Sequence, residues 1–389
     1  MDFELTEEQR ALRRATADFA REEIAPRVAR MDAEDRFPGS LRDSMRRRGL
    51  WGLPFPAAYD GGGLGYLDYV IALEQIAQES LAVAATLSVH TMAAATVFHH
   101  GTDEQRRRWL PPLLAGDEVG TFSFTELATG SNPAAITTTA ERNGHGFVLS
   151  GQKMFASNST LGGAAIIFAK DKEQDDRITA FVVAKHGEGY RPGTPVRKMG
   201  LGGFETAPFV LDGYRVAEDG VLGGEAMRGR GFDVLLDMIT IGKLGIAAQS
   251  LGLAGRALRE AVTYAGQRRQ LNKPLRMFST IQALVAEMAT AVEASRWMAY
   301  HAAFRRDAGH GIAVEAAMAK LFCAETAKVV VDKSLSVHGC YGYTKEFTVE
   351  RLYREVKLGE LYEGTPEMQK LLIASKVLWS SEARHGDQA

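Results

Sequence analysis

Apolar residues recur at helical spacing through the first third of the chain. Thr6 and Gln9 have the spacing of a capping box, in which each side chain bonds the backbone N–H of the other residue. Thr102 and Gln105 repeat that signal farther along. The apolar positions that follow the two boxes are Leu12, Phe19, Ile24, Val28, Met31, Trp109 and Leu113. Residues 1–120 are therefore predicted to form an N-terminal helical domain.

The pattern changes to short β-rich runs between residues 121 and 230. Residues 146–150, 164–168 and 178–183 are such runs, and Gly, Asn and Asp turns separate them. Strands follow one another here without helices between them, which disfavours the doubly wound sheet of nicotinamide-binding proteins. We expect a middle, mainly antiparallel β domain over 121–230.

Long helical patterns return after residue 231. They cover approximately 232–265, 280–307, 312–338 and 366–382. The order is therefore α, then β, then α, without internal repeats. The sequence predicts an α+β protein with a C-terminal helical bundle over 231–389.

Composition narrows the classes of function. The 389 residues carry a formal net charge of −2, which gives no field suited to nucleic acid or an anionic membrane surface. The two cysteines lack CxxC spacing, and no pair of histidines has metal-ligand spacing, so we predict neither disulfides nor a metal site. The acidic N-terminus does not resemble a signal peptide. We found no apolar stretch of about 18 residues, and we expect a cytoplasmic protein without a membrane span.

The segment around Glu363 carries the most specific chemistry. Thr365 and Pro366 form a helix-start signal, and Gly364 permits a tight turn just before it. Glu363 is thus held on a short loop beside Leu361 and Tyr362. A carboxylate near apolar groups would have its pKa raised from about 4.3 towards neutrality, as a general base requires. The alternative is an exposed loop glutamate, which composition alone favours.

Motifs in all three regions resemble one known family. Residues 362–365 with Met368 and Gln369 resemble the motif YEGT-x-x-[IM]Q of the acyl-CoA dehydrogenase family. Phe124-Thr125-Glu126 with Gly130-Ser131-Asn132 is similar to the family's TE-x-x-x-GSD, and residues 151–158 resemble G-x-K-x-W-I-T-N. Further matches follow in the family's order: Lys198-Met199-Gly200, residues 246–249, Tyr264 with Arg268, and residues 315–322.

The resemblance implies both a reaction and partners. The family's α-β-α domain order agrees with the pattern above. By resemblance, Glu363 removes the α-proton of an acyl thioester, the β-hydride moves to N5 of FAD, and a trans-2-enoyl thioester is formed. The backbone N–H of Glu363 and an FAD hydroxyl would polarise the thioester carbonyl. An electron-transfer flavoprotein would accept the electrons, and the setting would be fatty acid metabolism. A homodimer or homotetramer is implied, since Arg268 would reach a neighbouring subunit's FAD.

The resemblance also assigns individual binding residues. Phe155 stands where the family has a tryptophan beside the flavin, and Ser157 replaces a threonine. The FAD-binding residues that it implies are Phe122, Phe124, Thr125, Ser131, Phe155, Ser157, Arg268, Thr365 and Glu367. The substrate-binding residues that it implies are Ser131, Lys243, Tyr362 and Gly364.

Several positions depart from the family pattern and keep alternatives open. The family's D-x-x-R, which contacts the CoA portion of the thioester, is Thr240 to Lys243 here, so an acyl-carrier protein could replace CoA. Departures at the FAD contacts are Leu271, Asn272, Ser279, Ser336 and Cys340. A flavin-dependent oxygen-using enzyme and a non-catalytic, FAD-poor member are the other interpretations, and the presence of Glu363 disfavours the first.

Overall fold

The computed structural model describes residues 4–379, which form two compact units. The described residues of the first unit are 4–25, 70–84 and 243–379. The second unit contains residues 26–69 and 85–242. This division does not test the domain boundaries predicted near residues 120 and 230, which stay predictions.

Both predicted capping boxes are present. The Thr6 hydroxyl accepts a hydrogen bond from the Gln9 N–H at 3.2 Å, and the Gln9 side chain accepts one from the Thr6 N–H at 3.1 Å, at the start of α1 (Glu7–Phe19). Thr102 and Gln105 make the same pair of bonds at the start of α6 (Asp103–Ala115). The other helices before residue 120 are η1 (Ala20–Ile24), α2 (Ala25–Glu34), α3 (Gly39–Arg47), η2 (Leu50–Gly52), η3 (Ala57–Tyr59), α4 (Tyr66–Glu79) and α5 (Leu81–His100).

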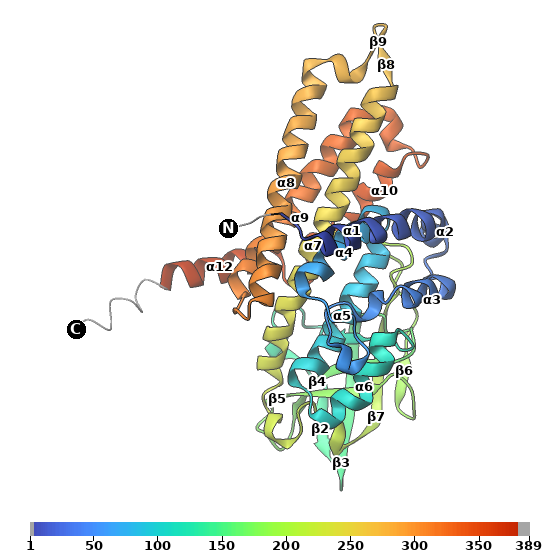
Figure 1. Cartoon of the computed structure of the whole chain (residues 1–389). Coiled ribbons are helices and arrows are strands. Elements are labelled where there is room, and N and C mark those ends of the chain that lie inside the picture. The colour runs from blue at the N-terminus through green and yellow to red at the C-terminus, as the bar shows by residue number, and fades with distance from the viewer. Residues whose placement is uncertain (1–3, 380–389) are drawn as a thin grey trace, which may run out of the picture. The chain divides into compact units, whose positions relative to one another are not determined.

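The second unit is built on a seven-stranded sheet (Figure 1). Its strands are β1 (Thr121–Ser123), β2 (Thr139–Arg142), β3 (Gly146–Ser157), β4 (Ala164–Asp171), β5 (Ile178–Ala184), β6 (Tyr190–Pro192) and β7 (Thr206–Ala217). The path is β1-β4-β2-β3-β7-β6, with β5 paired to β4. Only β1 and β2 pair in parallel with β4, so the prediction of a mainly antiparallel sheet is confirmed.

A buried ion pair ties this sheet to the segment that follows β1. The Lys153 side chain, fully buried on β3, donates to Glu126 at 2.9 Å and to the Phe168 carbonyl at 2.7 Å. Glu126 also accepts from the hydroxyls and N–H groups of Thr137 and Thr138. Burial alone would raise the pKa of Glu126, but the Lys153 charge and these hydrogen bonds lower it to about 2. The carboxylate is therefore ionised at neutral pH.

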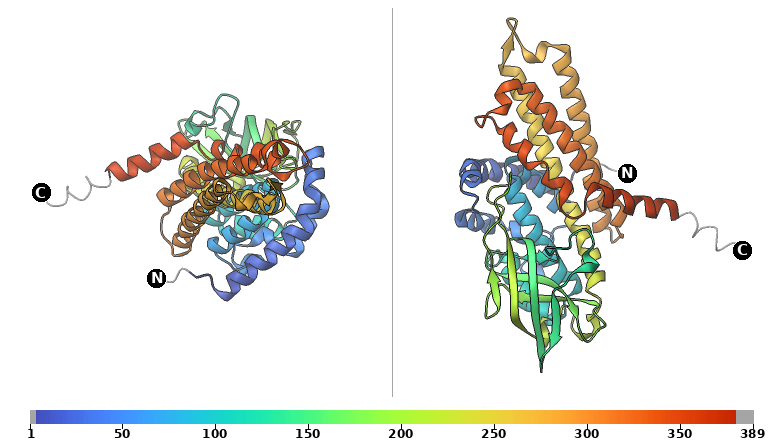
Figure 2. Two further views of the ribbon diagram at one scale, coloured as in Figure 1. Left: turned by 90° about the horizontal axis from the view of Figure 1, so that it is seen from above. Right: turned by 180° about the vertical axis from the view of Figure 1, so that it is seen from behind.

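Long helices make up most of the first unit. They are the part of α7 (Gly231–Gln267) from residue 243, then α8 (Ser279–Asp307), α9 (Ala313–His338), α10 (Thr348–Glu355), α11 (Leu358–Leu361) and α12 (Pro366–Trp379). Figure 2 shows α8 and α9 side by side. The start and end of α7, α8 and α9 lie within two residues of the prediction. For α12 the start matches, and the predicted residues 380–382 lie outside the described part.

A short hairpin connects α7 to α8. Its strands are β8 (Arg269–Gln270) and β9 (Lys273–Pro274), and the turn between them is Leu271-Asn272. Both turn residues have positive φ, 47° and 63°, as a two-residue hairpin turn of type I′ requires. The Leu271 side chain is 83% exposed. Two of the departures from the family pattern therefore form the tip of this turn.

Two helices are long and apolar enough to cross a membrane, although the sequence pattern predicted no such stretch. They are α5 and α7, with mean hydropathies of 1.6 and 1.4 over the most apolar window. Those windows are 94% and 83% buried inside the protein. Burial of this extent is typical of core helices, so their length and composition are weak evidence for a membrane span.

Candidate active site

Glu363 lies on a loop whose backbone is strained. The loop joins α11 to α12, and α12 begins at Pro366 as predicted. Glu363 has φ 53° and Gly364 has φ 89°, both in the left-handed region. A Cβ atom on Gly364 would lie 2.6 Å from Nε2 of Gln369, so a side chain there would disturb that amide. The glycine is thus required by space as well as by conformation.

Hydrogen bonds to backbone carbonyls hold this loop in place. Nζ of Lys320, on α9, donates to the Gly364 carbonyl at 2.6 Å and to the Glu360 carbonyl at 3.3 Å. Nε2 of Gln369, on α12, lies 3.1 Å from the Glu363 carbonyl and 3.0 Å from the Gly364 carbonyl. Two neighbouring helices therefore fix the carbonyls on either side of the candidate base.

The Glu363 carboxylate is buried although the residue as a whole is half-buried. Its Oε2 is inaccessible and makes no hydrogen bond within residues 4–379. Burial raises the pKa of Glu363 to about 7, and the nearby charges of Lys243 and Lys320 lower it in part. The structure thus disagrees with the alternative of an exposed loop glutamate. The group can be ionised or protonated near neutral pH, as a general base requires.

The backbone of the same residue offers a hydrogen-bond donor. The Glu363 N–H donates no hydrogen bond to the part of the chain that the structure describes. An N–H group and a carboxylate oxygen of one residue therefore both lack a hydrogen-bond partner within residues 4–379. This pair of groups suits a reaction in which a proton is removed while negative charge develops on a carbonyl oxygen.

The first unit brings together four of the sequence-predicted residues. Lys243 is 7% exposed, and its pKa is lowered by desolvation while the charge of Glu363 acts in the opposite direction. The Tyr362 hydroxyl donates to Oε1 of Gln249 at 2.5 Å. Tyr362 and Gly364 adjoin Glu363 in the sequence, and the Lys243 charge acts on its carboxylate. Their assignment to substrate binding stays a prediction.

Three residues of this cluster were missed as site residues. Lys320, Gln369 and Gln249 all lie inside the motifs that carry the family resemblance. Their roles could not be read there, because each acts through a hydrogen bond whose partner lies elsewhere in the sequence. The signal that could have found them is a charged or amide side chain within an otherwise apolar helical segment.

The predicted flavin-contacting aromatic residues lie in the second unit. Phe155 is 60% exposed and has φ 52°, at a register shift between β3 and β7. Such a bulge redirects a side chain out of the regular alternation. The Phe124 ring lies edge-on to that of Phe122, with centroids 6.3 Å apart, and the Thr125 carbonyl accepts from the Met154 N–H at 2.8 Å. These bonds place the segment after β1 next to β3.

These residues fit a flat aromatic cofactor with polar edges. The exposed ring of Phe155 offers a face for stacking. The buried Ser123 hydroxyl makes no hydrogen bond to any described residue, so it keeps an unused donor and acceptor. Phe122 differs, because it is 7% exposed and packs on Phe168, so its side chain belongs to the core. Ser131 is exposed and Ser157 half-buried.

The remaining predicted FAD contacts belong to the first unit. The Arg268 guanidinium lies 5.1 Å from the ring centroid of Tyr341, which orients it. Glu367 is exposed, and a hydrogen bond from the Thr365 side chain is the largest cause of its lowered pKa. The contact of Arg268 with a neighbouring subunit stays a prediction.

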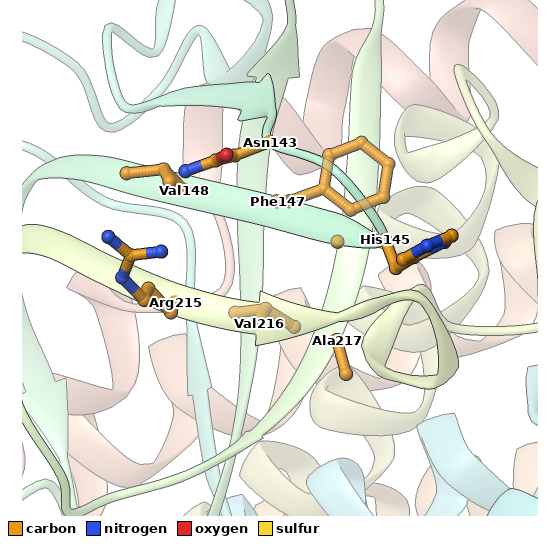
Figure 3. A pocket seen from close by; sticks show the side chains of 8 residues that line it. Asn143, His145, Phe147, Val148, Arg215, Val216 and Ala217 are labelled. Carbon is orange, nitrogen blue, oxygen red and sulfur yellow. The ribbon is translucent and has the colours of Figure 1, made fainter.

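A small pocket lies away from these residues. It has a volume of about 200 Å³ and lies at the turn between β2 and β3, beside the end of β7. Figure 3 shows Asn143, His145 and Arg215 around it. No residue assigned to substrate or cofactor lines this pocket. Titratable groups that shift one another's pKa lie instead at Glu363, Lys243 and Lys320.

The charged groups that act on the Glu363 carboxylate are two ammonium groups, those of Lys243 and Lys320. Within residues 4–379, no group of three or more His, Cys, Asp or Glu side chains is placed to hold a metal ion. The cluster can accept a proton at a carboxylate and offer hydrogen-bond donors to a developing anion.

Comparison with family models places matches along almost the entire chain. Residues 6–117 match the model described as acyl-CoA dehydrogenase, N-terminal domain. Residues 121–214 match the middle domain of that family, and residues 229–378 match its C-terminal domain.

Individual proteins resemble the chain over nearly its full length. An acyl-CoA dehydrogenase of Bacillus subtilis is 38% identical, over 96% of this chain and 99% of its own length. The structure of butyryl-CoA dehydrogenase from Megasphaera elsdenii superposes with a TM-score of 0.94 at 32% identity, over 97% of this chain and 100% of that one. A solved chain whose description concerns the electron transferring flavoprotein of Acidaminococcus fermentans also gives 0.94, at 34% identity, over 97% of this chain and 99% of that one.

Proposed function

The chain belongs to the acyl-CoA dehydrogenase family, and on that premise we propose that Glu363 is the base that removes the α-proton of its substrate. The activity is the FAD-dependent α,β-dehydrogenation of an acyl-CoA. FAD, when bound, supplies the acceptor for the hydrogen that leaves the β-carbon as hydride. The dehydrogenase relatives named above favour this activity over the predicted alternatives, an oxygen-using enzyme and a non-catalytic member.

The observation that carries the proposal is the state of Glu363. An α C–H bond is a weak acid, so its proton is lost only if a base is close and the resulting charge on the thioester oxygen is stabilised. Burial raises the pKa of Glu363 to about 7, and Oε2 makes no hydrogen bond to the described residues, so no described group competes with a substrate proton for that oxygen. The open N–H of Glu363 is suited to the thioester oxygen.

The other assignments are part of the same proposal. Phe124, Thr125, Ser131, Phe155 and Ser157 would contact FAD, supported by the exposed Phe155 ring. Phe122 would contribute its backbone, since its side chain is in the core. Thr365 and Glu367 would contact FAD and Arg268 the FAD of a neighbouring subunit, while Lys243, Tyr362, Gly364 and Ser131 would contact the thioester.

The substrate size and the partners of this protein are proposed from its likeness to the relatives. The likeness to butyryl-CoA dehydrogenase supports a short acyl group carried by CoA, and we propose CoA over an acyl-carrier protein. The likeness to the Acidaminococcus chain supports an electron transferring flavoprotein as electron acceptor. A cytoplasmic homo-oligomer, a dimer or tetramer, acting in fatty acid metabolism completes the proposal.

Substrate titration of the FAD-loaded protein tests this function. Acyl-CoAs of increasing chain length and the matching acyl-carrier-protein thioesters are mixed with the protein without oxygen, and loss of the oxidised-flavin absorbance is followed. We expect fast bleaching by a short acyl-CoA, slower bleaching as the chain lengthens, and the enoyl thioester as product. Bleaching by no thioester, with the flavin fully bound, contradicts the proposal.

The rate of bleaching should depend on pH with a midpoint near 7. Below the pKa of about 7, Glu363 is mostly protonated and cannot accept a proton, so the rate falls about tenfold for each pH unit. Above it, the carboxylate is ionised and the rate levels off. Single-turnover rates measured from about pH 5.5 to 8 check this, and a rate that decreases with rising pH contradicts it.

A further inference from the structure

A fully buried lysine lies beside Glu363 and has no part in the reaction as proposed above. The Lys320 side chain on α9 is 0% exposed. A buried ammonium group costs several kcal/mol unless hydrogen bonds and opposite charges compensate it. Because an apolar residue would fill this position of the helix at lower cost, the contacts of Lys320 indicate what the charge does.

Those contacts connect α9 to both sides of the base. The ammonium donates to the Gly364 carbonyl at 2.6 Å and to the Glu360 carbonyl at 3.3 Å. Glu363 lies between these two residues in the sequence. Lys320 therefore connects the end of α11 with the loop residue that follows the base.

Other charged groups face Lys320 from each neighbouring helix. Glu363 and Glu360 raise its pKa, as does Glu367 on α12, whereas Lys243 on α7 and, above all, desolvation lower it, to about 8. The Glu360 carboxylate is already bound by Lys328 and Lys357. The charge of Lys320 is therefore not neutralised by Glu360 alone and acts on Glu363 as well.

We propose that Lys320 is a positioning residue, whose ammonium holds the loop around Glu363 by two carbonyls and stabilises the ionised carboxylate. The proposal rests on the proposed function of Glu363 as the base. The hydrogen bonds keep Glu363 in its left-handed conformation, and the charge offsets part of the cost of burying an anion. Without Lys320 the carboxylate would be both displaced and harder to ionise.

Substitutions that separate charge from hydrogen bonding test the proposal in the FAD-loaded protein. Lys320→Met removes both, Lys320→Gln removes the charge and keeps a donor, and Lys320→Arg keeps both in a different shape. Lys328→Met is the matched control, since Lys328 is on the same helix and bonds Glu360 at 3.4 Å, but its side chain is 57% exposed. Single-turnover flavin reduction is measured for each variant against pH.

The expected result is a shift of the pH midpoint as well as a loss of rate. For Lys320→Met we expect the midpoint to rise by about one pH unit and the plateau rate to fall about tenfold or more, because an opposite charge nearby favours the ionised form. Lys320→Gln should show the same rise, Lys320→Arg should restore the midpoint, and Lys328→Met should match the unchanged protein.

Unfolding by denaturant gives a readout that does not need turnover. Since the pKa of folded Glu363 is raised from 4.5 to about 7, its contribution to stability is fully present below about pH 4.5 and is lost as pH rises through 7. In Lys320→Gln this loss should extend to higher pH, and adding Glu363→Gln should abolish the difference.

Two outcomes overturn the proposal. One is a pH midpoint in Lys320→Met and Lys320→Gln equal to that of Lys328→Met, even if their rates are lower. The other, which applies also when Lys320→Met does not fold, is a Lys320→Gln protein whose stability depends on pH as in the unchanged protein. A failure of the proposed function looks different, because Glu363→Gln would then keep its rate.

Discussion

Glu363→Gln will lower the rate of flavin reduction by about 10²–10⁴-fold, the usual contribution of a general base. The amide has nearly the same shape as the carboxylate but cannot accept a proton. Oε2 makes no hydrogen bond within residues 4–379, so the substitution breaks no contact there. Single-turnover mixing with butyryl-CoA in the absence of oxygen measures the loss.

The matched control for this experiment is Glu325→Gln. Glu325 is on α9 and pairs with Lys370 at 3.0 Å, with its side chain 46% exposed. The control should reduce the flavin at the unchanged rate. FAD content and substrate affinity should be the same in both variants. If Glu363→Gln reduces its flavin as fast as the control does, another group is the base.

Lys153→Met should destabilise the second unit by about 3–5 kcal/mol, the typical cost of removing one partner of a buried ion pair. Lys153 is fully buried and Glu126 is nearly so, with their charged atoms 2.9 Å apart. Methionine fills similar space but leaves the Glu126 carboxylate without its cation. Urea unfolding at neutral pH measures the change in the free energy of unfolding.

Lys172→Met is the control for that measurement. Lys172 pairs with Asp176 at the same distance, 2.9 Å, but the two side chains are 43% and 50% exposed. An exposed pair contributes about 0–1 kcal/mol, so this substitution should be nearly neutral. An equal decrease in the free energy of unfolding for the two variants would show that the Glu126–Lys153 pair contributes no more than an exposed ion pair. The double substitution Glu126→Gln with Lys153→Met should recover part of the loss.

Long periodic segments made the fold predictable. The patterns of α7, α8 and α9 are sustained over many turns, so errors at single positions did not move their bounds far. The boxes at Thr6 and Thr102 fixed two helix starts, because their side chains bond the local backbone. The apolar length of α5 was not predicted. Its own residues also do not tell whether such a helix is buried in a protein core or crosses a membrane.

The candidate site was predictable where its chemistry is local in sequence. Glu363 and Gly364 are adjacent, and the turn and helix start around them leave a recognisable pattern. Lys320 and Gln369 bind backbone carbonyls of that loop. Every residue has a backbone carbonyl, so the sequence does not indicate which one a side chain binds. Whether the Phe122 side chain lies in the core could not be decided from the sequence, because an aromatic residue suits a cofactor and a core equally well.

The conformation and burial that suit Glu363 to catalysis lower the stability of the folded protein. Its left-handed φ of 53° costs a non-glycine residue of the order of 1 kcal/mol. Ionising it with a pKa raised from 4.5 to about 7 costs about 3 kcal/mol more at alkaline pH. Selection of this protein for thermal stability alone would favour glycine at position 363. The resulting variants would be more stable but would no longer dehydrogenate acyl-CoA.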